Sequence, residues 1–404
     1  MKKLEKSVPV IRFKGFSEAW EQRKLGEDVN FLNGRAYSQK ELLDKGKYKV
    51  LRVGNFNTND RWYYSDLELE ENKYANRGDL LYLWATNFGP EIWNQEKVIY
   101  HYHIWKLKIM NINVSKQYLY TWLITDKERI KQSTNGTTMV HVTKGHIEQR
   151  EFQIPPNLAE QQKIGTFFKQ LDDTIALHQR KLDTLKLIKK GFLQQMFPNN
   201  DKEIPNMRFT DFYGIWEQRK LKSITEKITR KNKELESTLP LTISAQDGLI
   251  DQNEYFNKII ASRNTRGYFL VKNGEFAYNK SYSKGYPWGV VKRLDNYDMG
   301  VLSTLYIIFK PTKINSDFLT KYFDSTYWYR AASQFATEGA RNHGLLNIAA
   351  SDFFEIELNI PLNNEEQKKI GLFFQQLENI IILHQNKLEK LSILKKTYLK
   401  KMFI

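Results

Sequence analysis

Two groups of polar loops hold the residue types that could do chemistry in this chain. The first group includes "FLNGRAY" from Phe31 and "STNGTTMVH" from Ser133, and the second includes "YNKSYSKGYPW" from Tyr278 and "ATEGARNHG" from Ala336. Arg can bind guanine and Asn adenine through two hydrogen bonds each, while Lys, Ser and Thr reach phosphates. For any single residue, ordinary turn chemistry is the better explanation of the residue type. The clustering of the whole set on loops of a basic chain favours nucleic-acid recognition.

The candidate contacts to nucleic acid fall in both halves of the chain. In the first half they are Asn33, Arg35, Tyr37, Arg52, Asn55, Asn57, Arg61, Thr86, Asn87, Asn135, Thr137 and His141. In the second half they are Arg263, Asn264, Arg266, Asn279, Lys280, Ser281, Tyr282, Lys284, Arg341, Asn342 and His343. We assign no catalytic residue and no metal ligand.

The overall charge agrees with this interpretation. The net charge is +16 and the sequence pI is about 9.5, which favours a polyanionic partner, although some soluble proteins are simply basic. The chain has no cysteine, which suits a reducing cytoplasm. The N-terminus lacks the apolar stretch of a signal peptide, and no apolar run reaches the roughly 18 residues of a membrane span. We therefore expect a cytoplasmic location.

The motifs of common enzymes are missing. We find no GxxxxGKS/T phosphate loop, no GxGxxG after a strand, no HExxH and no D/N-P-P-Y/F tetrapeptide of adenine methyltransferases. Seven histidines without cysteine offer little support for metal chemistry. The sequence therefore indicates a binding protein without a cofactor of its own.

An internal duplication indicates how the loops are positioned. "WEQRKL" occurs at Trp20–Leu25 and again at Trp216–Leu221. A longer pair begins "IPPNLAEQQKIGTFFKQL" at Ile154 and "IPLNNEEQKKIGLFFQQL" at Ile360. Repeated boundaries around divergent segments indicate one plan used twice. We expect Trp20 and Trp216 to pack at equivalent junctions, with the neighbouring Glu and Arg side chains facing solvent or a partner.

Both long repeats have the heptad pattern of a helical seam. Each predicted helix spans about 38 residues, or about 57 Å. We predict that the two pair antiparallel as a coiled coil; the alternative is two amphipathic helices buried in separate domains. His178 and His384 occupy seam positions, where we expect polar residues that fix register and not metal ligands. The predicted seam comprises Ile164, Phe168, Leu171, Ile175, His178, Leu182, Leu185, Ile370, Phe374, Leu377, Ile381, His384, Leu388 and Leu391.

The divergent segments share an element order that predicts two similar α/β (α+β) domains. In the first, alternating β-branched and aromatic residues predict strands at 47–56, 78–85 and 97–109, followed by a helix at 115–132. In the second, they predict strands at 239–245, 274–281, 289–294 and 300–310, then a helix at 315–334. The predicted divisions are a recognition domain at 1–157, a spacer helix at 158–198, a second recognition domain at 199–362 and a second spacer helix at 363–404.

The combination of "F-x-x-x-W-E-Q-R-K-L" before each divergent unit with "EQxKIGxFFxQL" and "LHQxKLxxL" in each long helix resembles the specificity subunit of type I restriction–modification systems. The resemblance covers essentially the whole chain. It implies two target recognition domains that each read one half of a split site in double-stranded DNA. It also implies an antiparallel coiled coil that sets the gap between the halves.

The same resemblance implies partners. Two modification subunits would methylate adenine at N6 in each half-site, and restriction (motor–nuclease) subunits would join this core. S-adenosylmethionine, ATP and magnesium would belong to those partners, and this chain would be non-catalytic. Two alternatives stay open at this point. One is a restriction or methylation enzyme with fused recognition domains, and the other is a basic coiled-coil scaffold that binds RNA or acidic proteins.

Overall fold

The computed structural model describes residues 8–56, 59–85, 87–133, 142–199, 202–258, 264–281, 285–335 and 348–403. The chain divides into two units, one comprising residues 1–179 and 386–404 and the other residues 180–385. Residues of each long helix fall in both units. The physical reason is that each half of a long helix packs against the domain beside it.

The first unit contains two four-stranded sheets with helix α2 (Lys116–Ser133) packed on the core. One sheet has the order β2-β9-β6-β7, formed by Val29–Asn33, Ile104–Ile109, Leu80–Leu83 and Gly89–Ile92. The other has the order β4-β3-β8-β5, formed by Tyr63–Ser65, Tyr48–Leu51, Val98–Tyr100 and Tyr74–Ala75. The short helices are α1 (Leu25–Asp28), α3 (Lys144–Glu148) and the 3-10 turns η1 (Gln39–Glu41), η2 (Val53–Phe56) and η3 (Glu71–Lys73).

The second unit repeats the central sheet with the order β12-β19-β16-β17, formed by Thr225–Ile228, Ile307–Pro311, Phe276–Asn279 and Val290–Arg293. Two further strand pairs are β13 (Leu241–Ser244) with β14 (Gly248–Asp251) and β15 (Phe269–Lys272) with β18 (Met299–Leu302). The helices are α5 (Leu221–Ile224), α6 (Gln252–Phe256), α7 (Ser316–Asp324), α8 (Trp328–Phe335) and α9 (Ala350–Glu355). The shared plan of two similar α/β halves is confirmed.

Several of the predicted elements differ in detail. The predicted strand at 300–310 is interrupted at residues 303–306, between β18 and β19, and the predicted strand at 47–56 forms β3 and then the 3-10 turn η2. The predicted helix at 315–334 is broken into α7 and α8, because the Ser325 hydroxyl donates to the Tyr322 carbonyl and accepts from the Tyr327 amide. The predicted strand at 97–109 is interrupted by a turn at His101–His103, which separates β8 from β9. A turn inside an apolar run leaves no signal in strand periodicity.

The repeated "EQRK" segments are strands. In each unit the segment pairs antiparallel with the last strand before the long helix: β1 (Glu21–Lys24) with β10 (Glu151–Ile154), and β11 (Glu217–Lys220) with β20 (Glu357–Ile360). Each pair thereby joins the start of the divergent domain to its end. These strands were not predicted, because four consecutive polar residues lack the alternation expected of a strand.

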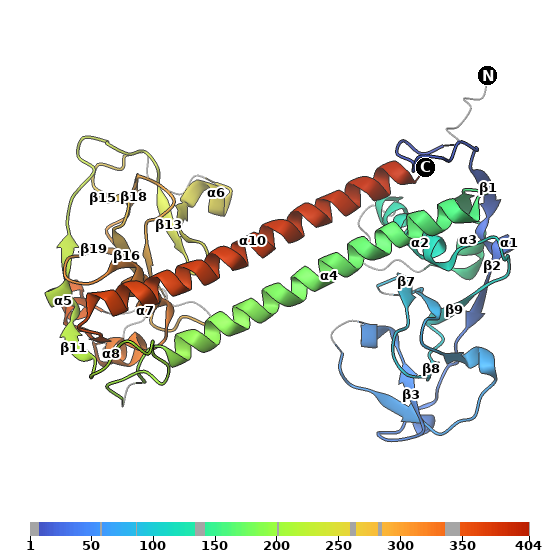
Figure 1. Ribbon diagram of the computed structural model, residues 1–404, viewed down its shortest axis with the longest axis horizontal. Coiled ribbons are helices and arrows are strands. Elements are labelled where there is room, and N and C mark those ends of the chain that lie inside the picture. The colour runs from blue at the N-terminus through green and yellow to red at the C-terminus, as the bar shows by residue number, and fades with distance from the viewer. Residues whose placement is uncertain are drawn as a thin grey trace. The chain divides into compact units, whose positions relative to one another are not determined.

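The long helices α4 (Leu158–Gln195) and α10 (Asn364–Met402) run antiparallel within each unit (Figure 1). In the first unit the Phe167 and Tyr398 rings lie 5.2 Å apart, and Asp172 pairs with Lys395 at 2.5 Å. In the second, Lys189 pairs with Glu378 at 2.6 Å and the Phe192 and Phe373 rings lie 4.9 Å apart. The residue numbers rise along one helix as they fall along the other, as the heptad pattern predicted.

The predicted seam side chains are all buried or partly buried. Those with at most 9% of their surface exposed are Ile164, Phe168, Leu171, His178, Leu182, Ile370, Phe374, Leu377 and Ile381. Those partly buried are Ile175, Leu185, His384, Leu388 and Leu391. Such burial along a heptad stripe is what a helical seam requires, while the supercoil itself stays a prediction.

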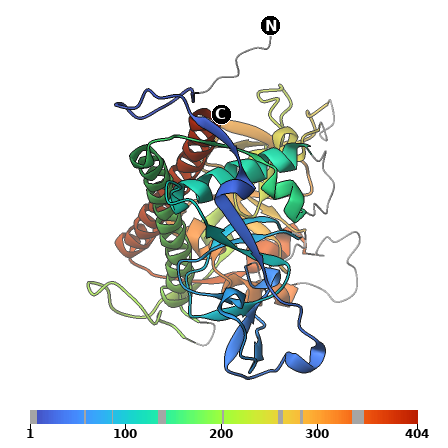
Figure 2. The same ribbon diagram turned by 90° about the vertical axis from the view of Figure 1, so that its right-hand side faces the viewer.

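The N-terminal segment lies against the end of α10 (Figures 1 and 2). The Ile11 amide donates to the Lys401 carbonyl at 3.0 Å. In the second unit the Met207 amide donates to the Gln195 carbonyl of α4 at 2.9 Å. The segment that precedes each "WEQRKL" therefore binds the C-terminal end of a long helix in the same way. In the described part of the chain, no helix is long and apolar enough to cross a lipid bilayer.

Candidate nucleic-acid interface

A buried ion pair fixes each divergent domain to its long helix. Arg12 donates to both carboxylate oxygens of Glu160 at 2.6 and 2.8 Å, and Arg208 donates likewise to Glu366 at 2.7 and 2.8 Å. The two carboxylates are almost completely buried, and the hydrogen bonds to Glu160 raise the pKa of Arg12. We call these the anchor pairs. Their bidentate geometry defines both distance and orientation.

The glutamine after each anchor glutamate makes a second, matching set of bonds. Gln161 accepts from the Ser115 amide at 2.8 Å and donates to the Pro155 carbonyl at 2.8 Å. Gln367 accepts from the Asn315 amide and donates to the Pro361 carbonyl at the same distances. Each glutamine therefore joins the strand before the long helix to the start of the domain helix. The repeated "EQ" has a structural function.

A glycine one turn later lets two helices approach closely. A Cβ atom at Gly165 would lie 2.8 Å from the backbone of Gln117 and Tyr118 in α2, and one at Gly371 would lie 2.7 Å from Asp317 Cβ in α7. Contacts that short do not occur between real Cβ atoms and backbone. The repeated "IG" therefore sets the distance between each long helix and its domain.

The two repeated tryptophans pack at equivalent junctions, which confirms that prediction. The Trp20 ring lies 6.0 Å from Tyr118 of α2 and 6.3 Å from Phe403 after α10. The Trp216 ring lies 5.7 Å from Phe318 of α7 and 6.1 Å from Phe197 after α4. Glu21 and Glu217 bind the neighbouring Arg23 and Arg219 at the surface.

On this frame, the first unit brings several of the predicted contact residues together. Arg35 donates to Glu41 at 2.6 Å and lies over the Tyr37 ring at 5.2 Å, and this bond is the largest cause that lowers the pKa of Glu41 to about 2. The guanidinium groups of Arg52 and Arg61 lie 5.4 and 5.0 Å from the Tyr63 ring. Arg52 and Arg61 are exposed, as phosphate or base contacts must be.

Asn55 has a local structural role. Its amide nitrogen donates to the carbonyls of Asn59 and Arg61, and its amide oxygen accepts from the Arg52 amide at 2.9 Å. Turn chemistry therefore explains this residue, the alternative that the sequence left open. Asn33 is exposed at the end of β2, and Asn87 is exposed before β7.

In the second unit, most of the described candidates make local bonds. Asn264 accepts from the Arg266 amide at 3.2 Å, and Arg266 donates to the Lys233 carbonyl at 2.7 Å while it stays exposed. Asn279 accepts from the Ser281 amide at 3.0 Å, and Lys280 donates to the Ile348 carbonyl at 3.4 Å. The remaining predicted contacts lie outside the described residues: Asn57, Thr86, Asn135, Thr137, His141, Arg263, Tyr282, Lys284, Arg341, Asn342 and His343.

The prediction missed an aromatic cluster on the first unit. His101, Tyr102 and His103 form the turn before β9, and their rings lie within 4.9 Å of one another. The Trp84 ring lies 4.8 Å from His103, and the Tyr37 ring stacks on His101 at 6.4 Å. Three consecutive aromatic residues with polar atoms, "HYH", were the available signal in the sequence.

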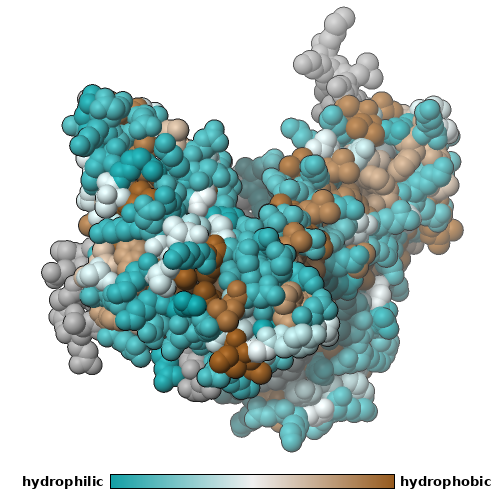
Figure 3. All heavy atoms as spheres, turned by 60° about the vertical axis from the view of Figure 1, so that its left-hand side comes forward, coloured by the Kyte–Doolittle hydropathy of each residue, from teal (hydrophilic) through white to brown (hydrophobic). Residues whose placement is uncertain are grey.

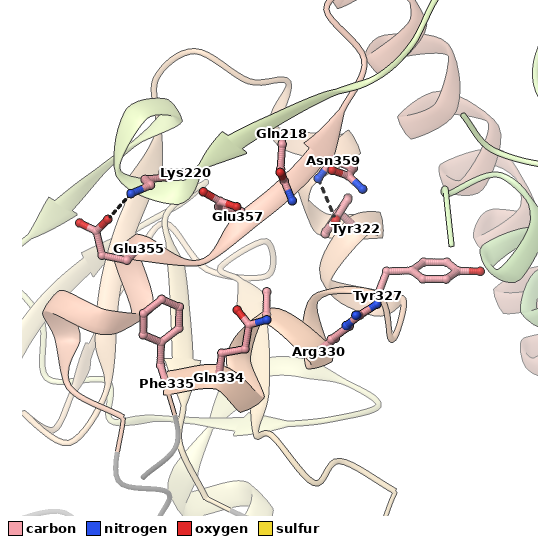
Figure 4. A pocket seen from close by; sticks show the side chains of 11 residues that line it. Gln218, Lys220, Tyr322, Tyr327, Arg330, Gln334, Phe335, Glu355, Glu357 and Asn359 are labelled. Carbon is pink, nitrogen blue, oxygen red and sulfur yellow. Dashed lines mark hydrogen bonds and ion pairs between the residues drawn. The ribbon is translucent and has the colours of Figure 1, made fainter. Parts of the chain in front are cut away.

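A polar cavity of about 500 Å³ lies in the second unit between the ribbon β11–β20 and helices α7 and α8 (Figure 4). Gln218 and Lys220 project from β11, and Arg330 and Gln334 project from α8. Its charged groups include Lys220, which donates to Glu355 at 3.0 Å. The lining side chains of this cavity include no Ser, Cys or His. Figure 3 shows that the visible surface is mainly hydrophilic, with scattered hydrophobic patches.

His178 and His384 show no metal-site geometry. Among the described residues, no group of three or more His, Cys, Asp or Glu side chains is placed to hold a metal ion. His178 is buried in the first unit. His384 lines a shallow hollow of the second unit with Arg180, Thr184 and Ile380.

Comparison with known proteins finds similarity to one family. Residues 17–187 match the family described as the type I restriction modification DNA specificity domain. A specificity subunit of the type I restriction enzyme MjaVIII from Methanocaldococcus jannaschii is 24% identical over 401 residues, covering 94% of this chain and 91% of that protein.

Solved structures share the fold over nearly the full length. The type I restriction–modification S subunit from M. genitalium gives a TM-score of 0.64 at 14% identity, with 98% of this chain and 99% of that chain covered. A chain from a study of complex assembly and conformational transition of the type I system gives a TM-score of 0.50 at 12% identity, with 95% and 97% covered. Over most of its length this chain is thus similar to specificity subunits of type I restriction–modification systems.

Proposed function

We propose that this chain determines the DNA sequence specificity of a type I restriction–modification complex. Each divergent domain reads one half of a bipartite site in double-stranded DNA, and the paired long helices set the unread gap. The observation that carries the proposal is a frame repeated in both units around surfaces that differ. The anchor pairs, the bridging glutamines and the close-approach glycines are the same in both units, whereas the loops that hold the candidate contacts differ.

Two recognition domains on one frame improve discrimination between DNA sites. A mismatched base pair costs about 1–3 kcal/mol, so a domain that touches three or four base pairs discriminates weakly against a genome of competing sites. A second domain held at a defined distance adds its own discrimination and a rule about spacing. A rigid connection also keeps the effective concentration of the second domain high once the first has bound.

The chemistry belongs to partners in this proposal. Two modification subunits methylate adenine at N6, one in each half-site, and restriction subunits join the same complex in the cytoplasm. S-adenosylmethionine, ATP and magnesium bind to those partners, and this chain supplies no catalytic residue. The basic charge of +16 supports the contact with DNA.

The experiment is an exchange of one recognition domain. Residues 26–153 are replaced by the matching domain of another specificity subunit, and the complex with its modification subunits methylates a genome that is then mapped for N6-methyladenine. We expect one half of the methylated site to change while the other half and the gap stay the same. A change in both halves contradicts the two-reader arrangement. Methylation by this chain alone with S-adenosylmethionine contradicts the assignment of chemistry to partners.

A further inference from the structure

The two units present the same turn with different side chains. In the first unit, Tyr82 of β6 pairs with Trp105 of β9, and in the second, Tyr278 of β16 pairs with Ile307 of β19. With this register the turns before β9 and β19 are equivalent, and we call them the reading turns. They comprise His101–His103 in the first unit and Ser303–Leu305 in the second. A hydrogen bond closes each turn, from Ile104 to His101 at 3.0 Å and from Tyr306 to Ser303 at 3.3 Å.

The reading turn of the first unit is held firmly by its backbone. The His101 amide donates to the Leu51 carbonyl at 2.9 Å, and the Tyr102 amide donates to the Arg35 carbonyl at 3.0 Å. Gly34 lies so close that a Cβ atom there would be 2.3 Å from the His101 carbonyl oxygen. A preorganised backbone favours base recognition, because conformational freedom that is lost on binding reduces the affinity.

Both turns carry exposed side chains, with Tyr102 at the centre of the first turn and Thr304 at the centre of the second. Tyr102 is 40% exposed and Leu305 is 58% exposed, and Thr304 is also exposed. The exposed Tyr102 ring carries a hydroxyl that can donate or accept a hydrogen bond, and the turn holds it in place. The residue types differ between the units although the frame around them is repeated. That combination is expected of positions that read two different half-sites.

Cationic and polar groups surround the turn of the first unit. Arg35 lies beside the turn, because its backbone amide donates to the Tyr100 carbonyl at 3.1 Å. Burial is the main cause that lowers the pKa of His101 to about 4. The nearby charges of His103 and Arg52 lower it further. His101 is therefore neutral at physiological pH, and a neutral imidazole both donates and accepts hydrogen bonds. The turn thus offers base-edge chemistry beside charges suited to phosphates.

We propose that the reading turns determine specificity, and that the Tyr102 hydroxyl hydrogen-bonds a base edge in the first half-site. The equivalent contact in the second unit comes from Thr304 and Leu305, a hydroxyl and an apolar side chain suited to a thymine methyl group. This inference rests on the proposed function, because it names side chains through which the recognition domains act.

The test uses the complex with its modification subunits and a plasmid library with both half-sites randomised, sequenced for N6-methyladenine. Tyr102→Phe removes only the hydroxyl and keeps the ring, so the fold is preserved. We expect the preference at one base pair of the first half-site to weaken about 2- to 12-fold, because that is the effect expected from the loss of one hydrogen bond. The second half-site and the gap should not change.

Two further variants sharpen the result. Replacing the first reading turn by the second, H101S/Y102T/H103L, should alter the preferred bases of the first half-site alone. Tyr213→Ala is the matched control, because Tyr213 is 84% exposed but lies in the linker before "WEQRKL". It should leave the methylated sequence unchanged.

Two results would overturn this inference. One is an unchanged first half-site in both Tyr102→Phe and the turn exchange. The other is a uniform loss of methylation over all sequences, which indicates a phosphate contact without base readout. The site methylated by the wild-type complex tests the proposed function separately. If that site is not split into two halves, the proposed function itself is contradicted.

Discussion

Removal of Arg208 should destabilise the second unit through the charge that it leaves behind. Arg208→Met keeps most of the side-chain length but removes both hydrogen bonds to Glu366, whose side chain is 1% exposed. A buried carboxylate without its partner costs about 3–5 kcal/mol. Arg208 also donates to the carbonyls of Tyr213 and Gly214 at the surface, and their loss adds little.

The double variant tests the mechanism. In Arg208→Met/Glu366→Met no charge is buried, and the main loss is the acceptor for Trp216 Nε1, which lies 3.3 Å from Glu366 Oε1. One unsatisfied buried donor costs about 1–3 kcal/mol. In the first unit, Trp20 Nε1 has no hydrogen-bond partner among the described residues, so this frame tolerates such a donor. The double variant should therefore be more stable than Arg208→Met.

The assay is urea unfolding combined with hydrogen exchange followed by mass spectrometry. Peptides from residues 202–258 and 348–377 should lose protection in Arg208→Met, while peptides from residues 8–56 report the first unit as an internal reference. Arg219→Met is the matched control, since its pair with Glu217 is 48% and 38% exposed and should contribute less than about 1 kcal/mol. A double variant as unstable as Arg208→Met, or less stable, would refute the reasoning.

Three further predictions concern the glycines, the long helices and one histidine. Gly371→Ala should destabilise by about 1–3 kcal/mol, because its Cβ would overlap α7. Gly191→Ala, in α4 with nothing within 4 Å, should stabilise by up to about 1 kcal/mol; thermal unfolding of both variants checks the contrast. One heptad added to each long helix lengthens the spacer by about 10 Å, so the unread gap should grow by about three base pairs while the bases stay the same. Methylated-site mapping measures this, and altered bases would count against it. The pKa of His101 is lowered to about 4 by burial, so the unfolded chain binds the proton first and stability should fall as the pH drops from about 6.5 to 4. His101→Gln should remove this part of the pH dependence in urea unfolding, and an unchanged dependence would show that another group causes it.

The duplicated frame could be predicted from the sequence because its elements produce local, repeated residue patterns. The heptads of residues 164–196 and 370–402 identified both long helices and their seam, since helical periodicity is a short-range signal. The place of Trp20 and Trp216 also followed from the repeat. The strand character of "EQRK" did not, because a polar strand owes its form to its partner strand and not to its own alternation.

The predicted contact residues show the same difference between what local sequence can predict and what it cannot. Arg35, Arg52 and Arg61 gather on the first unit as expected, whereas Asn55 serves its own turn. A residue type states which hydrogen bonds a side chain can make, but the local backbone decides which of them it makes internally. The reading turn at His101–His103 was hidden inside a stretch that the sequence predicted to be one continuous strand.

By itself the sequence determined that the chain is built twice on one plan, with two long helices, a basic charge and no recognised catalytic motif. These properties are sums or periodicities along the chain, so they need no knowledge of the fold. Only the tertiary structure decided that Arg12 binds Glu160, that Gly165 sets a helix contact, and that Tyr102 occupies the place of Thr304. Those facts join residues that are distant in the chain, and only packing and strand register bring them into contact.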